Sequence, residues 1–402
     1  MSPIDTHSDR IPVPSPADAH RPLRVAIVTE SFLPQVNGVT NSVCRVADML
    51  AAQGHRALIL APGHDGPTHQ SGFPVVRTPS IPLPGYRGFS LGLPARRTLT
   101  TAIRSFSPDV IHLASPALMG MATVEAARRW ALPTVAVFQT DLPGFARRYG
   151  LPGTEHIWTA LRRVHAAVDR TLVPSSATME ALSARGFPRL DLWRRGVDVR
   201  RFHPDHRDEE LRRRLAPNGE AIVGYVGRLA KDKRVDLLEH VLKLRGVKVV
   251  VVGDGPELPR LRRRLRGAIF TGQRTGEDLS RLYASLDLFV HTGADETFCQ
   301  AVQEALASGV PVVAPAAGGP LDLVEHERNG LLYAPDSVRE LRVAVGRLAH
   351  NRSVRETLAA RARASVEHRT WEAVGEELIG HYRSVLASSR ELAERNSAAG
   401  VP

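Results

Sequence analysis

The stretch "ADETFCQAVQEALASGVPVVAP", residues 294–315, joins a loop, a predicted helix and a predicted buried strand. Its closing run "VPVVAP" is apolar and lies between glycine and proline, which is typical of a parallel strand covered on both faces. Before that run, Thr297 and Gln300 stand in the capping-box relation, which predicts Thr297 as the N-cap of a helix over about 298–308. A helix followed at once by a buried strand indicates an α/β fold.

Two acids flank the start of this helix. Glu296 lies in the loop before the helix, whereas Glu304 lies inside it, roughly two turns in. Between them the helix N-terminus presents free backbone N–H groups, which favour an anion. An acid, an anion site and a second acid in this order suit a ligand that contains a sugar, a phosphate and a ribose.

The same alternation of strand and helix occurs in both halves of the chain. The predicted strands are the apolar runs "LRVAIVTE" (23–30), "ALILAP" (57–62), "DVIHLASP" (109–116), "PTVAVFQTD" (133–141), "AIVGYVGR" (221–228), "VKVVVVGDG" (247–255), "AIFTG" (268–272), "LDLFVH" (286–291) and "VPVVAP" (310–315). Near-continuous apolar strands separated by helices predict parallel sheets. We therefore expect an α/β protein of two doubly wound, Rossmann-like domains that face each other across a cleft.

The domain boundaries follow from composition and from the pattern of strands. Residues 1–22 are polar and Pro-rich and are predicted to be a disordered tail. The first domain is expected over 23–196 and the second over 197–375. Residues 376–402 are expected to form a helix that returns toward the first domain, with a frayed end over 388–402.

Length and cysteine usage limit the class of protein. The 402 residues suffice for two domains, and no apolar run approaches the ~18 residues that a membrane span needs. The two cysteines, Cys44 and Cys299, argue for a reducing cytoplasm and against a disulfide scaffold. No Cys/His spacing indicates a zinc site.

The formal net charge of +11 comes almost entirely from arginine. One interpretation is the codon usage of a GC-rich genome, and the other is attraction to an anionic membrane at the inner face of the plasma membrane. The clusters that would serve the second are Arg147/Arg148 and Arg162/Arg163. Nucleic-acid binding is disfavoured because the basic residues are not interleaved with aromatic ones and no binding module is present.

Several polar residues and glycines follow predicted strands, where open parallel sheets bind ligands. Arg228 and Lys233 lie on one loop, where they either clamp a diphosphate or remain solvated surface cations. Gly253 lies in "VVGDGPE", which lacks the G-x-G-x-x-G spacing and is by itself only a tight turn. Gly38 lies near a helix N-terminus, where its backbone can approach a phosphate or simply relieve a turn.

The first half also carries three polar candidates at strand ends. His112 follows the predicted strand "DVIHLASP", where a lone histidine is more often packed than catalytic. Gln139 and Asp141 follow the next strand, in "FQTDLPGF". An uncharged Gln is a poor general base but a good hydrogen-bond partner for hydroxyls. His112, Gln139 and Asp141 are therefore treated as candidate contacts to a sugar or an acceptor.

Taken in order, the motifs "GRLAKDK", "VVGDGPE", "ETFCQAVQEALASGVPVVAPAAGGPLDLV" and "RNGLLY" resemble the retaining GT-B glycosyltransferases of family GT4, over roughly residues 23–385. The wording of "NGVTNSV", "FQTDLPGF" and "ETFCQAVQEALASG" most resembles actinobacterial GDP-mannose-dependent α-mannosyltransferases that act on glycolipids. The resemblance implies a hexosyltransferase that moves α-mannose from GDP-mannose onto a glycolipid or glycan hydroxyl at the inner membrane face.

The resemblance also implies roles for the two acids and for the helix start between them. Glu296 and Glu304 match the E-x7-E motif of the family, so Glu296 is expected to hold hydroxyls of the donor hexose and Glu304 those of the ribose. Phe298 and Cys299 are expected to offer backbone N–H groups to the diphosphate.

The glycines and the basic pair match further parts of the family's site. Arg228 and Lys233 match the diphosphate clamp and count, with Glu296, as the catalytic residues. Gly38 matches the N-domain loop that meets the donor from across the cleft, and Gly253 is expected to bind the donor as well.

One departure from the family concerns Gln139, because many relatives carry His there in "FHTD"-like wording. That His touches the sugar near the reacting centre, so in this chain the role is expected to pass to Gln139 or the neighbourhood to be rearranged. No side chain is named as general base.

The expected mechanism is front-face substitution with retention. A double displacement needs two carboxylates that flank the anomeric carbon, whereas Glu296 and Glu304 are separated by ~12 Å along the helix axis. No D-x-D pair is evident at a strand end, so we expect no metal and no cofactor beyond the nucleotide-sugar substrate.

Other interpretations stay open. The nearest is a UDP-sugar-dependent transferase of the same family, with a glucose, glucuronate or sulfoquinovose donor. A nucleotide-sugar 2-epimerase on the same scaffold is disfavoured by the E-x7-E wording. An oxidoreductase is disfavoured because neither half has a dinucleotide fingerprint. The acceptor would be contacted by the first half, plausibly by residues 79–97.

Overall fold

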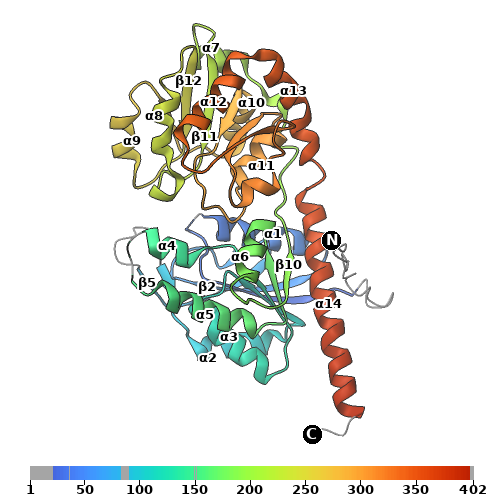
Figure 1. Cartoon of the computed structure of the whole chain (residues 1–402). Helices are drawn as coiled ribbons and strands as arrows, with labels where there is room; N and C mark the ends of the chain where they lie inside the picture. The colour runs from blue at the N-terminus through green and yellow to red at the C-terminus, as the bar shows by residue number, and fades with distance from the viewer. Residues whose placement is uncertain (1–20, 36, 83–89, 149, 151, 399–402) are drawn as a thin grey trace, which may run out of the picture.

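Two separate parallel sheets, each covered by helices on both faces, form the two lobes of the molecule (Figure 1). This computed structural model describes residues 21–35, 37–82, 90–148, 150 and 152–398. The expected N-terminal tail therefore lies outside the described residues, apart from its last two positions. The middle of the candidate acceptor segment, 83–89, also lies outside them.

The first sheet builds the N-terminal lobe, with strand order β10-β9-β8-β7-β1-β2-β4-β3. Its strands are β1 (Arg24–Thr29), β2 (Arg56–Pro62), β3 (His69–Gln70), β4 (Phe73–Thr78), β7 (Val110–Ala114), β8 (Thr134–Val137), β9 (Arg170–Val173) and β10 (Leu190–Leu192). Every neighbouring pair is parallel except β3 and β4. A separate antiparallel pair is formed by β5 (Ser80–Pro82) and β6 (Ser90–Gly92).

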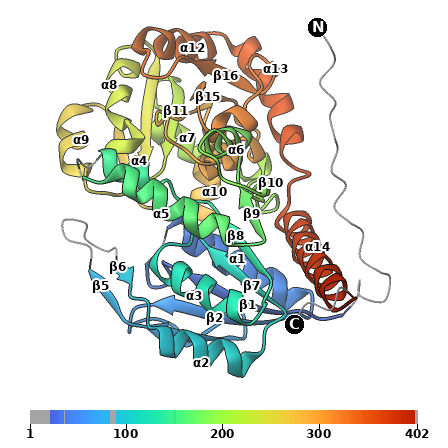
Figure 2. The same ribbon diagram turned by 60° about the horizontal axis from the view of Figure 1, so that its bottom comes forward.

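Apolar helix faces cover both sides of this sheet. The helices α1 (Gly38–Ala52) and α14 (Trp371–Ala398) pack on one side. On the other side pack α2 (Arg96–Phe106), α3 (Leu118–Arg129) and α5 (Thr154–Ala166). Two shorter helices, α4 (Leu142–Arg148) and α6 (Ser176–Ser183), lie at the edge that faces the other lobe (Figure 2).

The second sheet builds the C-terminal lobe, with strand order β13-β12-β11-β14-β15-β16, parallel throughout. Its strands are β11 (Ala221–Val226), β12 (Val247–Val252), β13 (Ile269–Gly272), β14 (Leu288–Val290), β15 (Val312–Pro315) and β16 (Gly330–Tyr333). Its helices are α7 (Glu209–Leu215), α8 (Leu238–Val241), α9 (Leu258–Arg264), α10 (Gly276–Ala284), α11 (Gln300–Ala307), α12 (Val338–His350) and α13 (Arg352–Ala362).

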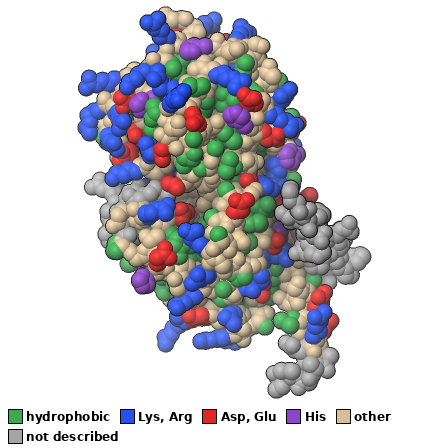
Figure 3. Space-filling model, in the orientation of Figure 1, with side chains coloured by type: hydrophobic (Ala, Val, Ile, Leu, Met, Phe, Trp, Pro, Cys, Tyr) green, Lys and Arg blue, Asp and Glu red, His purple; other side chains and the backbone are tan. Residues whose placement is uncertain are grey.

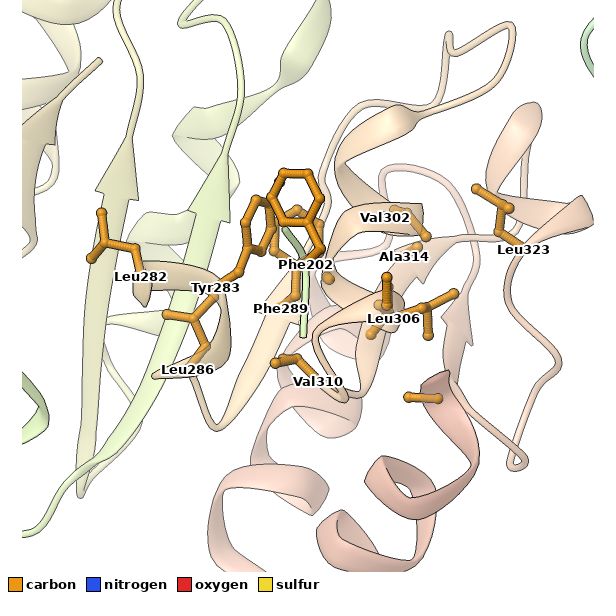
Figure 4. Close-up of a cluster of buried hydrophobic side chains, with 14 of the residues drawn as sticks. Phe202, Leu282, Tyr283, Leu286, Phe289, Val302, Leu306, Val310, Ala314 and Leu323 are labelled. Carbon is orange, nitrogen blue, oxygen red and sulfur yellow. The ribbon is translucent and has the colours of Figure 1, made fainter. Parts of the chain in front are cut away.

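A cluster of buried side chains supports α11 from behind (Figure 4). Phe202, from the segment that links the lobes, packs edge-on against Tyr283 of α10, with ring centroids 5.5 Å apart. Tyr283 in turn packs against Phe289 of β14 at 5.8 Å. Side chains of α11 belong to the same close-packed cluster, which therefore holds the helix against the sheet. Phe202 ties the linking segment to this core.

The chain crosses between the lobes twice, and the two crossings lie side by side. Val197 on the first crossing forms a parallel bridge with Thr370 on the second. A Cβ at Gly196 would lie 2.8 Å from the backbone of Trp371, so glycine is needed for this close approach. After the second crossing, α14 runs along the N-terminal lobe (Figure 1).

All nine predicted strands are present, so the expected fold is confirmed. In each sheet the strand order reverses next to the first strand, between β1 and β7 and between β11 and β14. Ligands of open parallel sheets bind at such switch points, outside the carboxyl ends of the strands. The candidate site is therefore to be sought beyond β11 and β14, opposite the N-terminal lobe.

Two helix boundaries differ from the prediction. The helix α11 begins at Gln300, not near 298, and its N-cap is Cys299 with φ 88° and no side-chain cap. The predicted capping box at Thr297 is wrong, because the Thr297 hydroxyl donates instead to the carbonyl of Gln139 at 3.3 Å. The C-terminal helix begins at Trp371, before the predicted 376, and stays helical to Ala398, so most of the predicted frayed end is ordered.

Candidate active site

The carboxyl ends of β11 and β14 present charged side chains at the switch point of the C-terminal lobe. Arg228 follows β11, and His291 comes directly after β14. The His291 ring stacks on Tyr225 of β11, with centroids 6.5 Å apart and an interplanar angle of 10°. Parallel β11 and β14 are neighbours, which brings two positions far apart in the sequence to one edge of the sheet.

A partly buried ion-pair network joins Glu296 to Lys233 and His291. Lys233 Nζ lies 2.7 Å from Glu296 Oε1 and 3.2 Å from Asp232 Oδ2. His291 Nε2 lies 3.2 Å from the same Glu296 oxygen. A carboxylate shared by two cations keeps its charge despite burial.

The pKa values in this network reflect burial and the competing charges. Burial alone would raise the pKa of Glu296, but Lys233 and His291 outweigh it and hold that pKa well below the usual range. Burial would lower the pKa of Lys233, but Glu296 and Asp232 raise it. Against burial, the Cys299 sulfur and the Glu296 carboxylate raise the pKa of His291 to about 10. The network is therefore ionised at neutral pH.

Glu304 lies on α11, separated from this network by the first turn of the helix. Burial raises the pKa of Glu304 to about 7, and the Tyr283 phenol, Arg201 and Arg45 only partly offset it. This acid thus differs from Glu296, because among the described residues it has no ion pair and the more distant Arg201 and Arg45 only partly favour its charge. A ribose hydroxyl that donates to Glu304 would relieve this desolvation.

The turn that leads into α11 has an unusual backbone. Cys299 is left-handed at φ 88°, and among the described residues the N–H groups of Phe298 and Cys299 donate to no backbone or side-chain acceptor. The loop is held from behind, where Gly319 N donates to the carbonyl of Glu296 at 2.8 Å. A Cβ at Gly319 would lie 1.8 Å from the Phe298 carbonyl, so only glycine fits there.

The two glycines that are predicted to meet the donor each have a local structural role. A Cβ at Gly253 would lie 2.0 Å from the Gly227 carbonyl, so this glycine allows the turns after β11 and β12 to pack together. Gly38 begins α1, where Asn37 caps the N–H groups of Val39 and Thr40. Contact of either glycine with a donor stays a prediction.

The N-terminal lobe reaches this site through Gln139, which follows β8. Its carbonyl accepts the Thr297 hydroxyl, next to Glu296, and its side-chain Oε1 accepts from Arg195 Nη2 at 2.6 Å. Arg195 Nη1 donates to the Gly38 carbonyl at 3.0 Å. Burial lowers the pKa of Arg195 to about 10, although Glu296 favours its charge. Arg195 thus brings Gln139 and Gly38 together, whereas their contacts with a donor or an acceptor stay predictions.

Two candidates of the N-terminal lobe have structural partners instead. Asp141 Oδ1 accepts from Gly144 N at 2.9 Å, so this acid caps the start of α4. His112 is buried in the core, with its Nδ1 2.8 Å from the hydroxyl of Tyr382 on α14. Burial lowers the pKa of His112 to about 4, so the ring is neutral. The structure does not bring His112 together with the other candidates.

The switch point of the N-terminal lobe also contains an acid that was not predicted. Glu30 comes directly after β1, and its Oε1 accepts from the backbone N–H groups of Ala117 and Gly120 at 2.7 and 2.9 Å. Burial raises the pKa of Glu30 to about 7 against these hydrogen bonds. This acid holds the start of α3 in place.

One trio of potential metal ligands occurs among the described residues. Ligand atoms of His291, Glu296 and Cys299 lie within 4.8 Å of one another. The Glu296 oxygen is already held by the Lys233 ammonium, which would repel a metal cation. The trio therefore fits an ion-paired network better than a metal centre.

Two residues of the site were missed in the sequence. His291 is the last residue of the predicted strand "LDLFVH", and its place at a carboxyl end is the signal that could have identified it. Arg195 lies in "RRGVD", inside the predicted boundary between the domains. No sequence signal connects it with Gln139, because their contact exists only once the lobes are assembled.

Family models match nearly the whole chain. Glycosyltransferase Family 4 matches residues 36–201, and Glycosyl transferases group 1 matches residues 206–365. A GDP-mannose-dependent alpha-mannosyltransferase of Mycobacterium tuberculosis is 51% identical over 90% of this chain and 97% of its own length. The chain belongs to glycosyltransferase family 4. The protein is therefore a glycosyltransferase, and the predicted family is confirmed.

Other relatives of this glycosyltransferase are more distant. A GDP-mannose-dependent alpha-mannosyltransferase of Corynebacterium glutamicum is 45% identical over 92% of this chain and 91% of its own length. A sulfoquinovosyl transferase of Arabidopsis thaliana is 33% identical over 90% of this chain and 74% of its own length.

Solved structures of glycosyltransferases share the arrangement of the two lobes. Sucrose-phosphate synthase from Thermosynechococcus elongatus aligns with a TM-score of 0.76 at 21% identity, covering 91% of this chain and 100% of that one. HepE of Anabaena in complex with UDP-glucose aligns with a TM-score of 0.72 at 22% identity, covering 90% and 100%. The enzyme therefore has the GT-B fold.

The raised pKa of Glu304 predicts how stability depends on pH. The folded state keeps the proton of Glu304 up to a pKa of about 7, whereas the unfolded state releases it near the ordinary glutamate pKa of 4.5. Stability from this group is therefore complete below pH 4.5 and is lost as the pH rises toward 7, on the order of 3 kcal/mol. Glu304→Gln removes the loss, so its melting temperature relative to wild type should increase between pH 5 and 8.

The measurement is thermal unfolding of both proteins across that pH range without ligand. Glu391→Gln, at an exposed position on α14, is the control and should keep a constant difference from wild type. A constant difference for Glu304→Gln as well would contradict the assigned protonation.

Proposed function

We propose that this glycosyltransferase transfers α-mannose, with retention, from GDP-mannose to a hydroxyl of a glycolipid or glycan. The observation that carries the proposal is the 45–51% identity, over about nine-tenths of the chain, to three GDP-mannose-dependent alpha-mannosyltransferases of actinobacteria. The charge arrangement supports it, because a cationic loop, backbone N–H groups without an acceptor among the described residues and a second acid follow one another along the donor's expected path.

In the proposed site the diphosphate lies against Arg228, Lys233 and the start of α11. Two cations and the N–H groups of Phe298 and Cys299 stabilise the charge that develops as the phosphate leaves. The bond between the anomeric carbon and the phosphate oxygen breaks while the acceptor oxygen bonds to the same face. The acceptor proton passes to the departing phosphate oxygen, so no side-chain base is required.

A second donor class is supported by one relative. The sulfoquinovosyl transferase of Arabidopsis thaliana is 33% identical over 90% of the chain, so a UDP-sugar donor is the alternative within the family. With a UDP-sugar as donor, the same residues would bind the diphosphate and the sugar. The difference would lie in the pocket for the base.

Thermal stabilisation by nucleotides tests the donor. A ligand that binds only the folded state stabilises it by RT ln(1 + [L]/Kd), so the better ligand raises the melting temperature more at equal concentration. GDP should therefore stabilise the enzyme more than UDP, with EDTA present throughout because no metal is proposed to take part. Preference for UDP would overturn the donor, and stabilisation that needs added magnesium would overturn metal independence.

Glu296 is proposed to hold hydroxyls of the donor hexose, and its substitution separates this role from binding of the nucleotide. Glu296→Gln should lower kcat by about 100-fold, because a transition-state contact is lost, and change the Kd for GDP less than fivefold. Turnover and GDP binding are measured on the same preparation. Equal losses in both would remove the assigned role.

Contact with an anionic membrane is a further part of the proposal. Among the described residues no helix is long and apolar enough to cross a membrane. The exposed pair Arg162 and Arg163 lies on α5, in the lobe expected to bind the acceptor. Basic side chains are spread over both lobes on the face seen in Figure 3, so the choice of surface needs a direct test.

Co-sedimentation with vesicles tests this surface. Removal of Arg162 and Arg163 by substitution with Gln should weaken binding to anionic vesicles about 30-fold, since each basic residue near such a surface contributes ~1 kcal/mol. The control removes the same charge from α7 with Arg213→Gln and Arg214→Gln, both exposed on the C-terminal lobe. Equal effects of the two pairs, or no dependence on salt, would contradict docking through the N-terminal lobe.

A further inference from the structure

Arg195 connects three parts of the site that are distant in the sequence. Its guanidinium donates to the Gln139 side chain at 2.6 Å and to the Gly38 carbonyl at 3.0 Å. Gln139 follows β8 and Gly38 begins α1, whereas Arg195 itself lies on the crossing to the C-terminal lobe. The guanidinium therefore spans the two N-terminal segments that face the Glu296 loop.

The backbone of this crossing is held by α11, the helix that carries Glu304. Gln303 Nε2 donates to the Arg195 carbonyl at 3.0 Å, and Gln300 Nε2 donates to the Gly196 carbonyl at 3.0 Å. These two hydrogen bonds hold successive carbonyls, so they fix the backbone from which the Arg195 side chain extends. The position of Arg195 is thus set by the helix of the donor site.

The hydrogen bond from Arg195 fixes the orientation of the Gln139 side-chain amide. A guanidinium has donors only, so the atom that faces it must be the carbonyl oxygen Oε1 and not the NH2 group. The NH2 group then points away from Arg195. Gln139 Nε2 is buried and has no hydrogen-bond partner within the structure.

A buried amide donor without a partner is costly and calls for an acceptor. Gln139 is 8% exposed, and its own carbonyl accepts the hydroxyl of Thr297, the neighbour of Glu296. The unpartnered NH2 group therefore lies where the Glu296 loop meets the N-terminal lobe. An oxygen of the bound nucleotide sugar is the acceptor that this place would receive.

We propose that Arg195 is a positioning residue, which orients the Gln139 amide so that its NH2 group donates a hydrogen bond to a sugar or diphosphate oxygen of the donor. The inference deepens the proposed function and rests on it for the presence of a nucleotide sugar. It also accounts for the departure at Gln139, because a histidine ring and an oriented amide both present an N–H group.

The rival explanation is that Arg195 and Gln139 only bridge the two lobes. Gln139→Glu separates the two explanations, because a carboxylate keeps the bond to Arg195, and strengthens it, but has no N–H to donate. A bridge would tolerate this change. If the Gln139 amide instead donates a hydrogen bond to the nucleotide sugar, the substitution removes that bond. The loss of one such hydrogen-bond donor lowers kcat by about 100-fold.

The experiment is a double-mutant cycle on steady-state turnover with Arg195→Met, Gln139→Met and the two together. If Arg195 acts through Gln139, Arg195→Met should lower kcat more than tenfold in the wild-type background and less than threefold beside Gln139→Met. Arg195→Lys should restore part of the rate, since an ammonium also presents donors only. The kcat of the Gln139→Glu variant should be about 100-fold lower than that of the wild type.

Arg363→Met is the matched control for lost stability. Arg363 donates to the carbonyls of Val199, Phe202 and Ala307, along the same crossing but away from Gln139. Its substitution should lower the melting temperature without changing kcat. Binding of GDP and of the whole donor to Gln139→Glu then locates the acceptor: a loss for both places it on the diphosphate, and a loss for the donor alone places it on the sugar.

Additive effects in the cycle, or full activity of Gln139→Glu, would overturn the positioning role. These outcomes are distinct from failure of the proposed function, because the wild-type donor is established first and the cycle is run on that donor. A UDP-sugar as substrate would overturn the mannosyl proposal and leave the cycle to decide the role of Arg195.

Discussion

The ion pair between Lys233 and Glu296 is the interaction on which the candidate site depends. Lys233 follows β11 and Glu296 follows β14, so a 2.7 Å contact ties the loops of two neighbouring strands. Asp232 and His291 complete the network and keep the carboxylate ionised while it is buried. Breaking one partner of a buried pair is far more costly than the pair is worth, so the loops hold one geometry.

The geometry of that loop also sets the start of α11. Gly319 holds the Glu296 carbonyl, and the left-handed Cys299 turns the chain so that the helix begins at Gln300. Glycine at 319 and an αL residue at 299 are both backbone requirements. The result is a helix start that has no side-chain cap.

The lobes meet through polar contacts around the same helix. Besides the Gln139 contacts, Asp322 of the C-terminal lobe accepts from the backbone and hydroxyl of Ser176 at 3.0 and 2.8 Å and from Arg194 at 2.9 Å. Polar interfaces of this kind allow lobes to separate more readily than apolar ones. The parallel bridge between Val197 and Thr370, by contrast, fixes the two crossings to each other.

The sequence by itself determined the strands, the two doubly wound sheets, the places of Arg228, Lys233 and Glu296 after strands, and the place of Glu304 inside the helix that follows. Apolar periodicity reports burial directly, so these elements could be predicted. The capping box at Thr297 was wrong because a tertiary partner, the Gln139 carbonyl, competes for the same hydroxyl. Only the tertiary structure revealed the contacts of Arg195 and His291 and the core position of His112. Their partners lie in other elements, and a long-range contact leaves no local pattern from which to infer it.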